Sequence, residues 1–396
     1  MQKVFIVSLF LFLISSSLMS HQRSESYSKV IIDNTEDTSQ VDVEFSIQTS
    51  ILQRLKKNFP KDWEQDLIQE IINNYQVKGD CKLKQDPLLK KSFATGYLSL
   101  IWAVDCQKEF IEIEFDLFVD EDPTHTHITT FLVNSEAIPE KIFTSADRHW
   151  AEGEVVSGDG ATFESFFDYL SLGFNHILSG YDHLAFLLAL LILNPRVKKI
   201  FYIVTGFTVG HSITLVLGAL GLIQPASQLV EALIGYSILI IAIECIASIS
   251  GRYRLYNNIL LLASILLIIS LLIAGDLKYL IGLLGISIFS YCYIELSSKQ
   301  STFVLPFVVT VLFGLVHGFG FAGNLSSLDL MEGRLLPAIL GFNLGVELGQ
   351  LLVVFFLLLI FLVLSSFLQK HKDLLRVVTA SGLTAVGTFW FLERII

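Results

Sequence analysis

Long apolar segments dominate the second half of the chain. From about Leu170 onward, hydrophobic runs follow one another with only short polar connections. A helix of about 20 apolar residues crosses ~30 Å of hydrocarbon, and a helix satisfies all of its backbone hydrogen bonds internally, as lipid requires. Charged residues make up only 16% of the chain, which is low for a soluble globular protein. The pattern predicts an α-helical polytopic membrane bundle.

Hydrophobic windows of spanning length predict about eight transmembrane helices within a helical domain at 168–396. The windows lie at 170–193, 200–220, 229–249, 257–274, 277–296, 303–322, 337–367 and 374–391. Only the short stretch from Gly275 to Lys278 separates the fourth window from the fifth. A count of seven spans is therefore the alternative.

Residues 1–20 are typical of a secretory signal peptide. Lys3 precedes an apolar stretch from Val4 to Ile14, and small residues follow up to Ser20. Cleavage there would leave His21 as the N-terminus, where its amine and ring could together bind a metal, although an unstructured terminal histidine is the simpler interpretation. The signal predicts that the next part of the chain is exported.

The exported segment, residues 21–167, is expected to form a small, mainly β domain, with a sandwich as the expected arrangement. One helix is predicted at Trp63–Tyr75, and strands are predicted at Val41–Ile47, Gly96–Val104, Glu109–Val119 and His127–Val133. No role is assigned to His125 or His127.

Cys81 and Cys106 both lie in the exported segment. An oxidising compartment favours a disulfide between them.

The basic residues between the windows predict the orientation in the membrane. With the β domain outside, the cytoplasmic connections hold Arg196, Lys198, Lys199, Arg252, Arg254, Lys299, Lys370 and Lys372, whereas the outer side holds Lys278, Arg334 and Arg394. Short cytoplasmic loops collect Lys and Arg, so we expect a multi-pass inner-membrane protein with a periplasmic N-terminal domain. The net charge of −11 argues against nucleic acid as a partner.

Ionisable and amide side chains occur within the apolar windows, where a charge costs several kcal/mol and marks a functional candidate. Imidazole and carboxylate together suit Ni, Co, Zn or Cu(II). We therefore expect a metal path within the helix bundle. Its candidate residues are His176, Asp182, His183, His211, Glu231, His317, Asn343 and Glu347.

Helical geometry predicts how the first-window residues are arranged. On one helix, His176 and His183 share a face and lie about 10 Å apart along the axis, which suits two successive sites. Asp182 lies about 100° around the helix from His183, which suits an acceptor that orients a ring nitrogen, or a ligand facing a neighbouring helix. With the predicted topology, the polar set forms a funnel from the outer surface to the membrane midplane.

Small residues accompany these candidates. They occur at Gly206, Gly210, Thr214 and Gly218, and again at Gly314 and Gly318 beside His317. Stripes of small residues allow membrane helices to approach closely.

The first-window motif, His176-x5-Asp182-His183, resembles the H-x5-D-H signature of the HupE/UreJ membrane proteins. The similarity extends through 207–212, 313–320 and 342–350, and 120–125 resembles the longer branch with an exported domain. The resemblance implies a nickel permease of the kind associated with hydrogenase and urease maturation, with the metal as substrate and no prosthetic group. Where short-branch permeases carry F-H-G-x-A/V-H-G-x-E, this chain has only His317, and Gly320 lies near the acidic position.

Two other functions remain open. An intramembrane zinc-dependent hydrolase could use three of the histidines and an acidic residue, although the sequence has no H-E-x-x-H motif and no rhomboid-like G-x-S-G setting. A metal-presenting accessory or sensor protein is the third possibility. Walker motifs are absent from the sequence, so no ATP-driven mechanism is encoded in it. The sequence identifies no protein partner.

Overall fold

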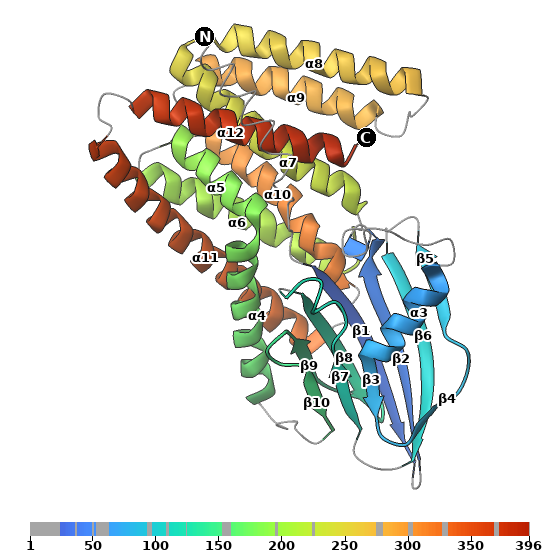
Figure 1. The fold of residues 1–396 in the computed structure, drawn as a ribbon. Coiled ribbons are helices and arrows are strands. Elements are labelled where there is room, and N and C mark those ends of the chain that lie inside the picture. The colour runs from blue at the N-terminus through green and yellow to red at the C-terminus, as the bar shows by residue number, and fades with distance from the viewer. Residues whose placement is uncertain are drawn as a thin grey trace.

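The structure is a computed structural model that combines a β-rich region with a bundle of helices (Figure 1). The predicted signal peptide and His21 lie outside the residues it describes. Those residues are 24–35, 38–49, 51–52, 63–92, 97–107, 111–123, 125–152, 160–194, 197–223, 226–274, 280–299, 304–326, 332–367 and 372–395.

The described β region contains one longer helix, α3 (Trp63–Asn74), and two sheets. In the larger sheet the order is β4-β6-β2-β1-β8-β9 with β5 also on β6, and in the smaller sheet it is β10-β7-β3. Only β1 and β8 pair in parallel among the described strands. The strands are β1 (Glu25–Asn34), β2 (Thr38–Gln48), β3 (Tyr75–Lys78), β4 (Cys81–Leu83), β5 (Leu88–Ser92), β6 (Tyr97–Gln107), β7 (Glu112–Phe115), β8 (Thr126–Val133), β9 (Glu136–Phe143) and β10 (His149–Ala151).

The two sheets share one apolar core, as expected of a sandwich. Phe131 of the larger sheet stacks on Trp150 of the smaller one, with ring centroids 4.0 Å apart. Tyr75 meets Trp102 edge-on at 5.5 Å. Burial of these large rings supplies much of the hydrophobic stabilisation of the region.

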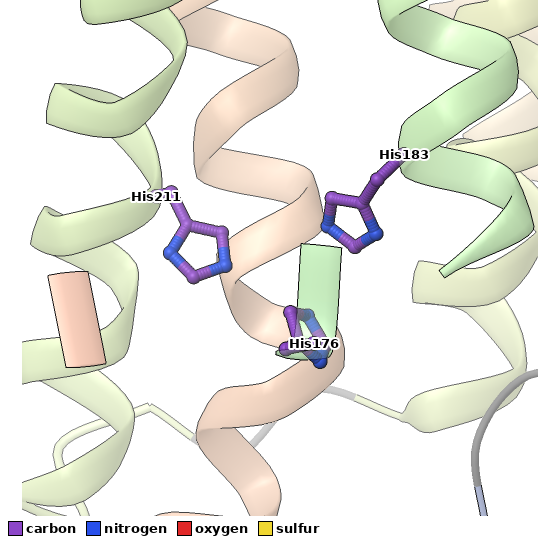
Figure 2. Close-up of side chains that lie close together, drawn as sticks. All are labelled: His176, His183 and His211. Atoms are coloured by element: carbon purple, nitrogen blue, oxygen red, sulfur yellow. The ribbon is translucent and has the colours of Figure 1, made fainter. Parts of the chain in front are cut away.

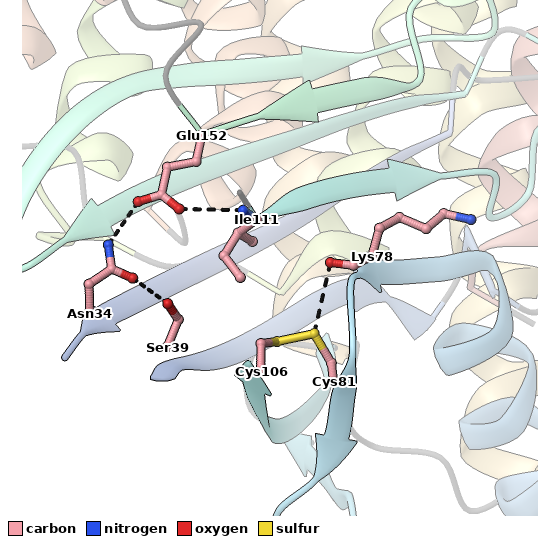
Figure 3. The surroundings of a disulfide bond; sticks show 7 residues. All are labelled: Asn34, Ser39, Lys78, Cys81, Cys106, Ile111 and Glu152. Atoms are coloured by element: carbon pink, nitrogen blue, oxygen red, sulfur yellow. Dashed lines mark hydrogen bonds between the residues drawn. A yellow bond between two sulfur atoms is a disulfide. The ribbon is translucent and has the colours of Figure 1, made fainter. Parts of the chain in front are cut away.

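A disulfide joins Cys81 of β4 to Cys106 of β6 (Figure 3). The two residues are direct partners in the antiparallel register of these strands. The bond therefore fastens the short edge strand β4 to the long strand β6.

The predicted strands β2, β6 and β8 and helix α3 are present, whereas strand β7 is shorter than predicted. It was expected over Glu109–Val119, of which 109–110 lie outside the described residues. The strand runs from Glu112 to Phe115 and ends early, because the chain turns at Leu117 and Phe118 adopts a positive φ of 62°. β1 was missed.

The alternation of apolar and polar residues did not predict β1, because serines as well as apolar residues face the interior in this part of the chain. Ser24, Ser26 and Ser28 form a buried hydrogen-bonded ladder with His125 and His127. Ser26 Oγ lies 2.8 Å from His125 Nε2 and 2.7 Å from His127 Nδ1, and Ser28 Oγ lies 2.9 Å from His127 Nε2. The parallel register of β1 and β8 pairs Ser26 with His127, so the serines and histidines lie next to one another. Both histidines are thus structural members of the β region.

Nine helices of the described residues form the second region. Six of them are long and apolar enough to cross a membrane, α4 and α5 qualify together as one bent span, and the apolar part of α10 is shorter, at Val304–Gly320. The helices are α4 (Gly160–Ser179), α5 (Tyr181–Leu193), α6 (Val197–Ala219), α7 (Ser227–Ser250), α8 (Tyr253–Ala274), α9 (Leu280–Lys299), α10 (Val304–Ser326), α11 (Glu332–Phe367) and α12 (Lys372–Glu393).

α8 and α9 lie side by side as separate helices at one edge of the bundle (Figure 1). The fourth and fifth hydrophobic windows therefore do not form one helix. In α7, 78% of the hydrophobic window is buried, against 11% in α8. α7 is thus a central helix, whereas α8 presents most of its apolar surface outward.

Glycines bring α6 and α10 into backbone contact. A Cβ at Gly314 would lie 2.1 Å from the carbonyl oxygen of Phe207, and a Cβ at Gly210 would lie 2.1 Å from that of Val311. Both distances are far below van der Waals contact, so no larger residue fits at either position without moving a helix. The predicted role of this glycine stripe in close packing is confirmed.

The same contacts show the relative directions of the helices. Gly206 packs on Phe307 and Gly210 on Val311, so residue numbers rise together and α6 and α10 are parallel. The pairing of α4 with α11 is also parallel, because Gly341 packs on Leu170 and Gly349 on Ile177. In α7 and α12 the order is reversed: Gly235 packs on Phe391, whereas Gly387 packs on Leu239, so these two helices are antiparallel.

Candidate metal site

A break at Gly180 shapes the site. The first hydrophobic window was expected to be one helix, but the chain bends by 68° between Phe166–Ser179 and Tyr181–Leu193. Gly180 has φ −79° and ψ 97°, values open to any residue. Space is what requires glycine, because a Cβ there would lie 2.6 Å from His183 Nδ1 and 2.9 Å from the carbonyl oxygen of His176.

The bend brings His176 and His183 together. Their ring centroids are 4.8 Å apart, so the predicted separation of about 10 Å on one straight helix is wrong. The chain folds the second histidine back toward the first instead of carrying it two turns along an axis.

Three histidines form the first candidate ligand group. His176 of α4, His183 of α5 and His211 of α6 each offer a ring nitrogen, and these atoms all lie within 4.8 Å of one another. Figure 2 shows the three rings turned toward a common space from different helices. Neutral imidazole is a preferred ligand of Zn, Cu, Fe and Ni.

A second group shares His183 with the first. Asp182, His183 and His317 of α10 also offer ligand atoms within 4.8 Å of one another. The rings of His183 and His317 are 5.3 Å apart. Five potential ligands from four helices thus form two overlapping three-ligand groups with His183 in common.

Asp182 fits both of the roles predicted for it, because it contacts the ring of His183 and also belongs to the second ligand group. Its Oδ1 lies 3.0 Å from His183 Nδ1 and accepts a hydrogen bond from the backbone N–H of the same residue at 2.9 Å. A carboxylate only accepts, so Nδ1 carries the ring proton. The lone pair of His183 is then on Nε2, the nitrogen available to a cation.

Four of the five clustered ligands are buried, and His176 is half-buried. His211 is 0% and His317 1% exposed, and the rings of Phe207 and Phe342 pack against His211 with centroids 6.2 and 6.1 Å away. Within the described part of the chain, His183 Nε2 and His317 Nδ1 have no hydrogen-bond partner. Buried polar atoms are normally satisfied, and ring nitrogens gathered in this way fit a metal ion.

Three predicted path residues lie outside the two groups. Glu231 is paired with Arg394, just after the end of α12, through an Nε–Oε2 contact of 3.0 Å. Glu347 accepts hydrogen bonds from Thr205, at 2.9 Å, and from Thr208 of α6. Asn343 donates to the backbone of Ile339 at 2.8 Å, and its side chain also interacts with His211 of the first group.

The predicted funnel of polar residues from the outer surface to the membrane midplane stays a prediction, but the histidines lie closer together than it implied. His317 was expected nearer the outer surface than His183, yet the two rings are in contact. Instead of a row of single positions, the bundle has one compact cluster with separately bonded carboxylates around it.

Ser237 was missed by the sequence reasoning. It lies on α7, and its Oγ is 3.0 Å from His317 Nε2. A serine in an apolar helix has no distinctive pattern, and only its contact with His317 reveals it.

A known protein family matches the helical region of the chain by sequence. No curated protein matches the chain. The sequence profile of the family described as HupE / UreJ protein matches residues 152–268 and 264–394, which include the break and all five clustered ligands. These two regions cover more than half of the chain and nearly all of the helical region. The chain belongs to the HupE/UreJ family.

Proposed function

We propose that this chain is a permease of the inner membrane that carries a divalent transition-metal ion, with nickel as the first candidate and cobalt, zinc and copper as the others. The observation that carries the proposal is the convergence of four histidines and Asp182 on two three-ligand groups that share His183. The family is associated with nickel and cobalt transport.

The ligand set supports transport better than permanent metal binding. A structural zinc site usually closes with four protein ligands, whereas each group here offers three. Transport requires sites that are strong enough to admit the ion and weak enough to release it. Because both groups include His183, an ion could exchange one set of partners for the other while it stays bound to that ring.

The helix directions support a bent first span that crosses the membrane. If α4 and α5 instead entered and left on the same side, the alternating order of the later helices would make α4 antiparallel to α11. The two are parallel. Parallel α6 and α10 and antiparallel α7 and α12 agree with the same alternation. With α10 counted, the proposed bundle has about eight spans.

The charges of the loops support an orientation of the chain in the membrane, and the exposed side chains of α8 and α9 support contact with lipid. We propose that the β region is periplasmic, because this orientation places most loop Lys and Arg in the cytoplasm. The outward-facing leucines and isoleucines of α8 and α9 suit contact with lipid hydrocarbon.

The proposal is tested by metal uptake into proteoliposomes. His183→Ala should lower uptake of the transported metal by at least about tenfold, since it removes a ligand common to both groups. His149→Ala is the matched control, because the side chain of His149 is 72% exposed on β10. Uptake of Ni, Co, Zn and Cu should be measured separately, and size-exclusion profiles should show that each variant is folded.

Retention of wild-type uptake of every metal by a folded His183→Ala protein would contradict the proposal. Loss of uptake in the His149→Ala control would show that the assay reports general damage rather than loss of a ligand.

A further inference from the structure

We infer that Ser237 is a positioning residue, which fixes the tautomer of His317 so that His317 Nδ1 faces the candidate ion. This inference rests on the proposed function for its consequence in metal binding. Ser237 itself contributes no atom to either three-ligand group.

The number of protons on Ser237 sets the direction of its hydrogen bonds. Its Oγ lies 2.7 Å from the carbonyl oxygen of Ile234 and 3.0 Å from His317 Nε2. A carbonyl oxygen only accepts, so the single hydroxyl proton must be directed to Ile234. The contact with the ring can then be a hydrogen bond only if His317 Nε2–H donates to the hydroxyl oxygen.

This assignment leaves the lone pair of His317 on Nδ1. That atom is buried and has no hydrogen-bond partner within the described chain. His317 is also one of the three residues whose ligand atoms converge with those of Asp182 and His183. The nitrogen not held by Ser237 is therefore the one available to a cation.

Ser237 and Asp182 thus have equivalent effects on two rings. Asp182 holds the proton on Nδ1 of His183 and leaves Nε2 available, whereas Ser237 holds the proton on Nε2 of His317 and leaves Nδ1 available. Partners that fix the tautomer and orientation of a metal-binding histidine typically contribute about 10–100-fold to affinity.

Ser237 is firmly held by the packing of α7 against α10. It is 0% exposed, and a Cβ at Gly320 of α10 would lie 3.3 Å from the side chain of Ile234. Because Ser237 is fully buried, its hydroxyl has no contact with solvent that could replace the contact with His317.

Two measurements on the full-length protein in lipid nanodiscs test the inference. The first reads the tautomer of His317 without metal, from ring nitrogen NMR shifts of protein labelled with 15N-histidine, assigned by comparison with His317→Asn. The second measures Co²⁺ affinity from the visible absorption of the bound ion. Ser237→Ala should disturb the Nε2–H signal of His317 and weaken Co²⁺ binding by about 10–100-fold.

Ser237→Thr, which keeps a hydroxyl, should retain both the tautomer and the affinity. The matched control is Ser250→Ala at the end of the same helix, where the serine hydroxyl donates to the carbonyl oxygen of Ala247. It should behave like wild type.

The inference is overturned if wild-type His317 carries its proton on Nδ1, a result that does not depend on any variant folding. It is also overturned if Ser237→Ala binds Co²⁺ within twofold of wild type with an unchanged His317 signal. The proposed function fails separately, if wild type binds none of the four metals while its His317 signal still responds to Ser237→Ala.

Discussion

Replacement of Gly180 by alanine tests the importance of the helix break directly. The added Cβ would lie 2.6 Å from His183 Nδ1, 2.9 Å from the carbonyl oxygen of His176 and 3.0 Å from Asp182 Oδ1. Three atoms of the candidate site thus surround one methyl group. The change adds no charge and removes no ligand, so any effect on metal binding must come from geometry.

The required displacement is large on the scale of metal coordination. Ordinary contact begins near 3.4 Å, so His183 Nδ1 must move by about 0.8 Å, whereas metal–ligand distances tolerate about 0.2 Å. Overpacking a well-packed interior costs about 1–3 kcal/mol. If that strain is relieved by moving His183, metal affinity should fall by about 10–100-fold, since each 1.4 kcal/mol is a factor of ten.

The assay is Co²⁺ or Ni²⁺ affinity of purified protein in nanodiscs, together with its thermal unfolding. Gly282→Ala on α9 is the matched control, because a Cβ there meets no atom within 4 Å. Gly282→Ala should leave both quantities unchanged. The reasoning is refuted if Gly180→Ala binds metal with wild-type affinity and unfolds at the wild-type temperature.

Further predictions concern the rest of the molecule. Replacing Cys81 and Cys106 by serine should lower the free energy of unfolding of the β region by about 3 kcal/mol, since the bond closes a loop over a separation of 25 residues; an unchanged urea midpoint would contradict this. Burial and the neighbouring His125 hold the pKa of His127 well below 6.5. Below about pH 6.5 the ring of His127 is therefore protonated in the unfolded chain but not in the folded one, and the free energy of unfolding should fall by up to about 1.4 kcal/mol per pH unit. His127→Gln should make this dependence on pH weaker. The same dependence in urea titrations of both proteins would exclude the mechanism. Lys198 is proposed to lie in the cytoplasm, so a cysteine in its place should react with a membrane-impermeant reagent only in opened cells. Labelling of this cysteine in intact cells would contradict the proposed topology.

Much of the fold could be predicted because membranes and sheets impose simple periodicities. Hydrophobic windows correspond to helices α6 to α12, and alternation located β2, β6 and β8. Prediction failed where polar residues are satisfied by distant partners. β1 carries inward serines whose histidine partners lie about 100 positions along the chain, and no local pattern shows that such a strand is buried.

The candidate ligands could be named from the sequence because charged or ionisable groups are costly in apolar helices. Their arrangement could not, because it depends on one glycine. Gly180 lies in a run of helix-compatible residues, and its backbone angles require no special residue. The chain bends there, and the close approach of His183 and His176 leaves no room for a Cβ. The break is thus a property of tertiary packing. The contacts that exclude a side chain at 180 hold His176 beside His211 and His183 beside His317, and they make two residues of one hydrophobic window part of a single cluster.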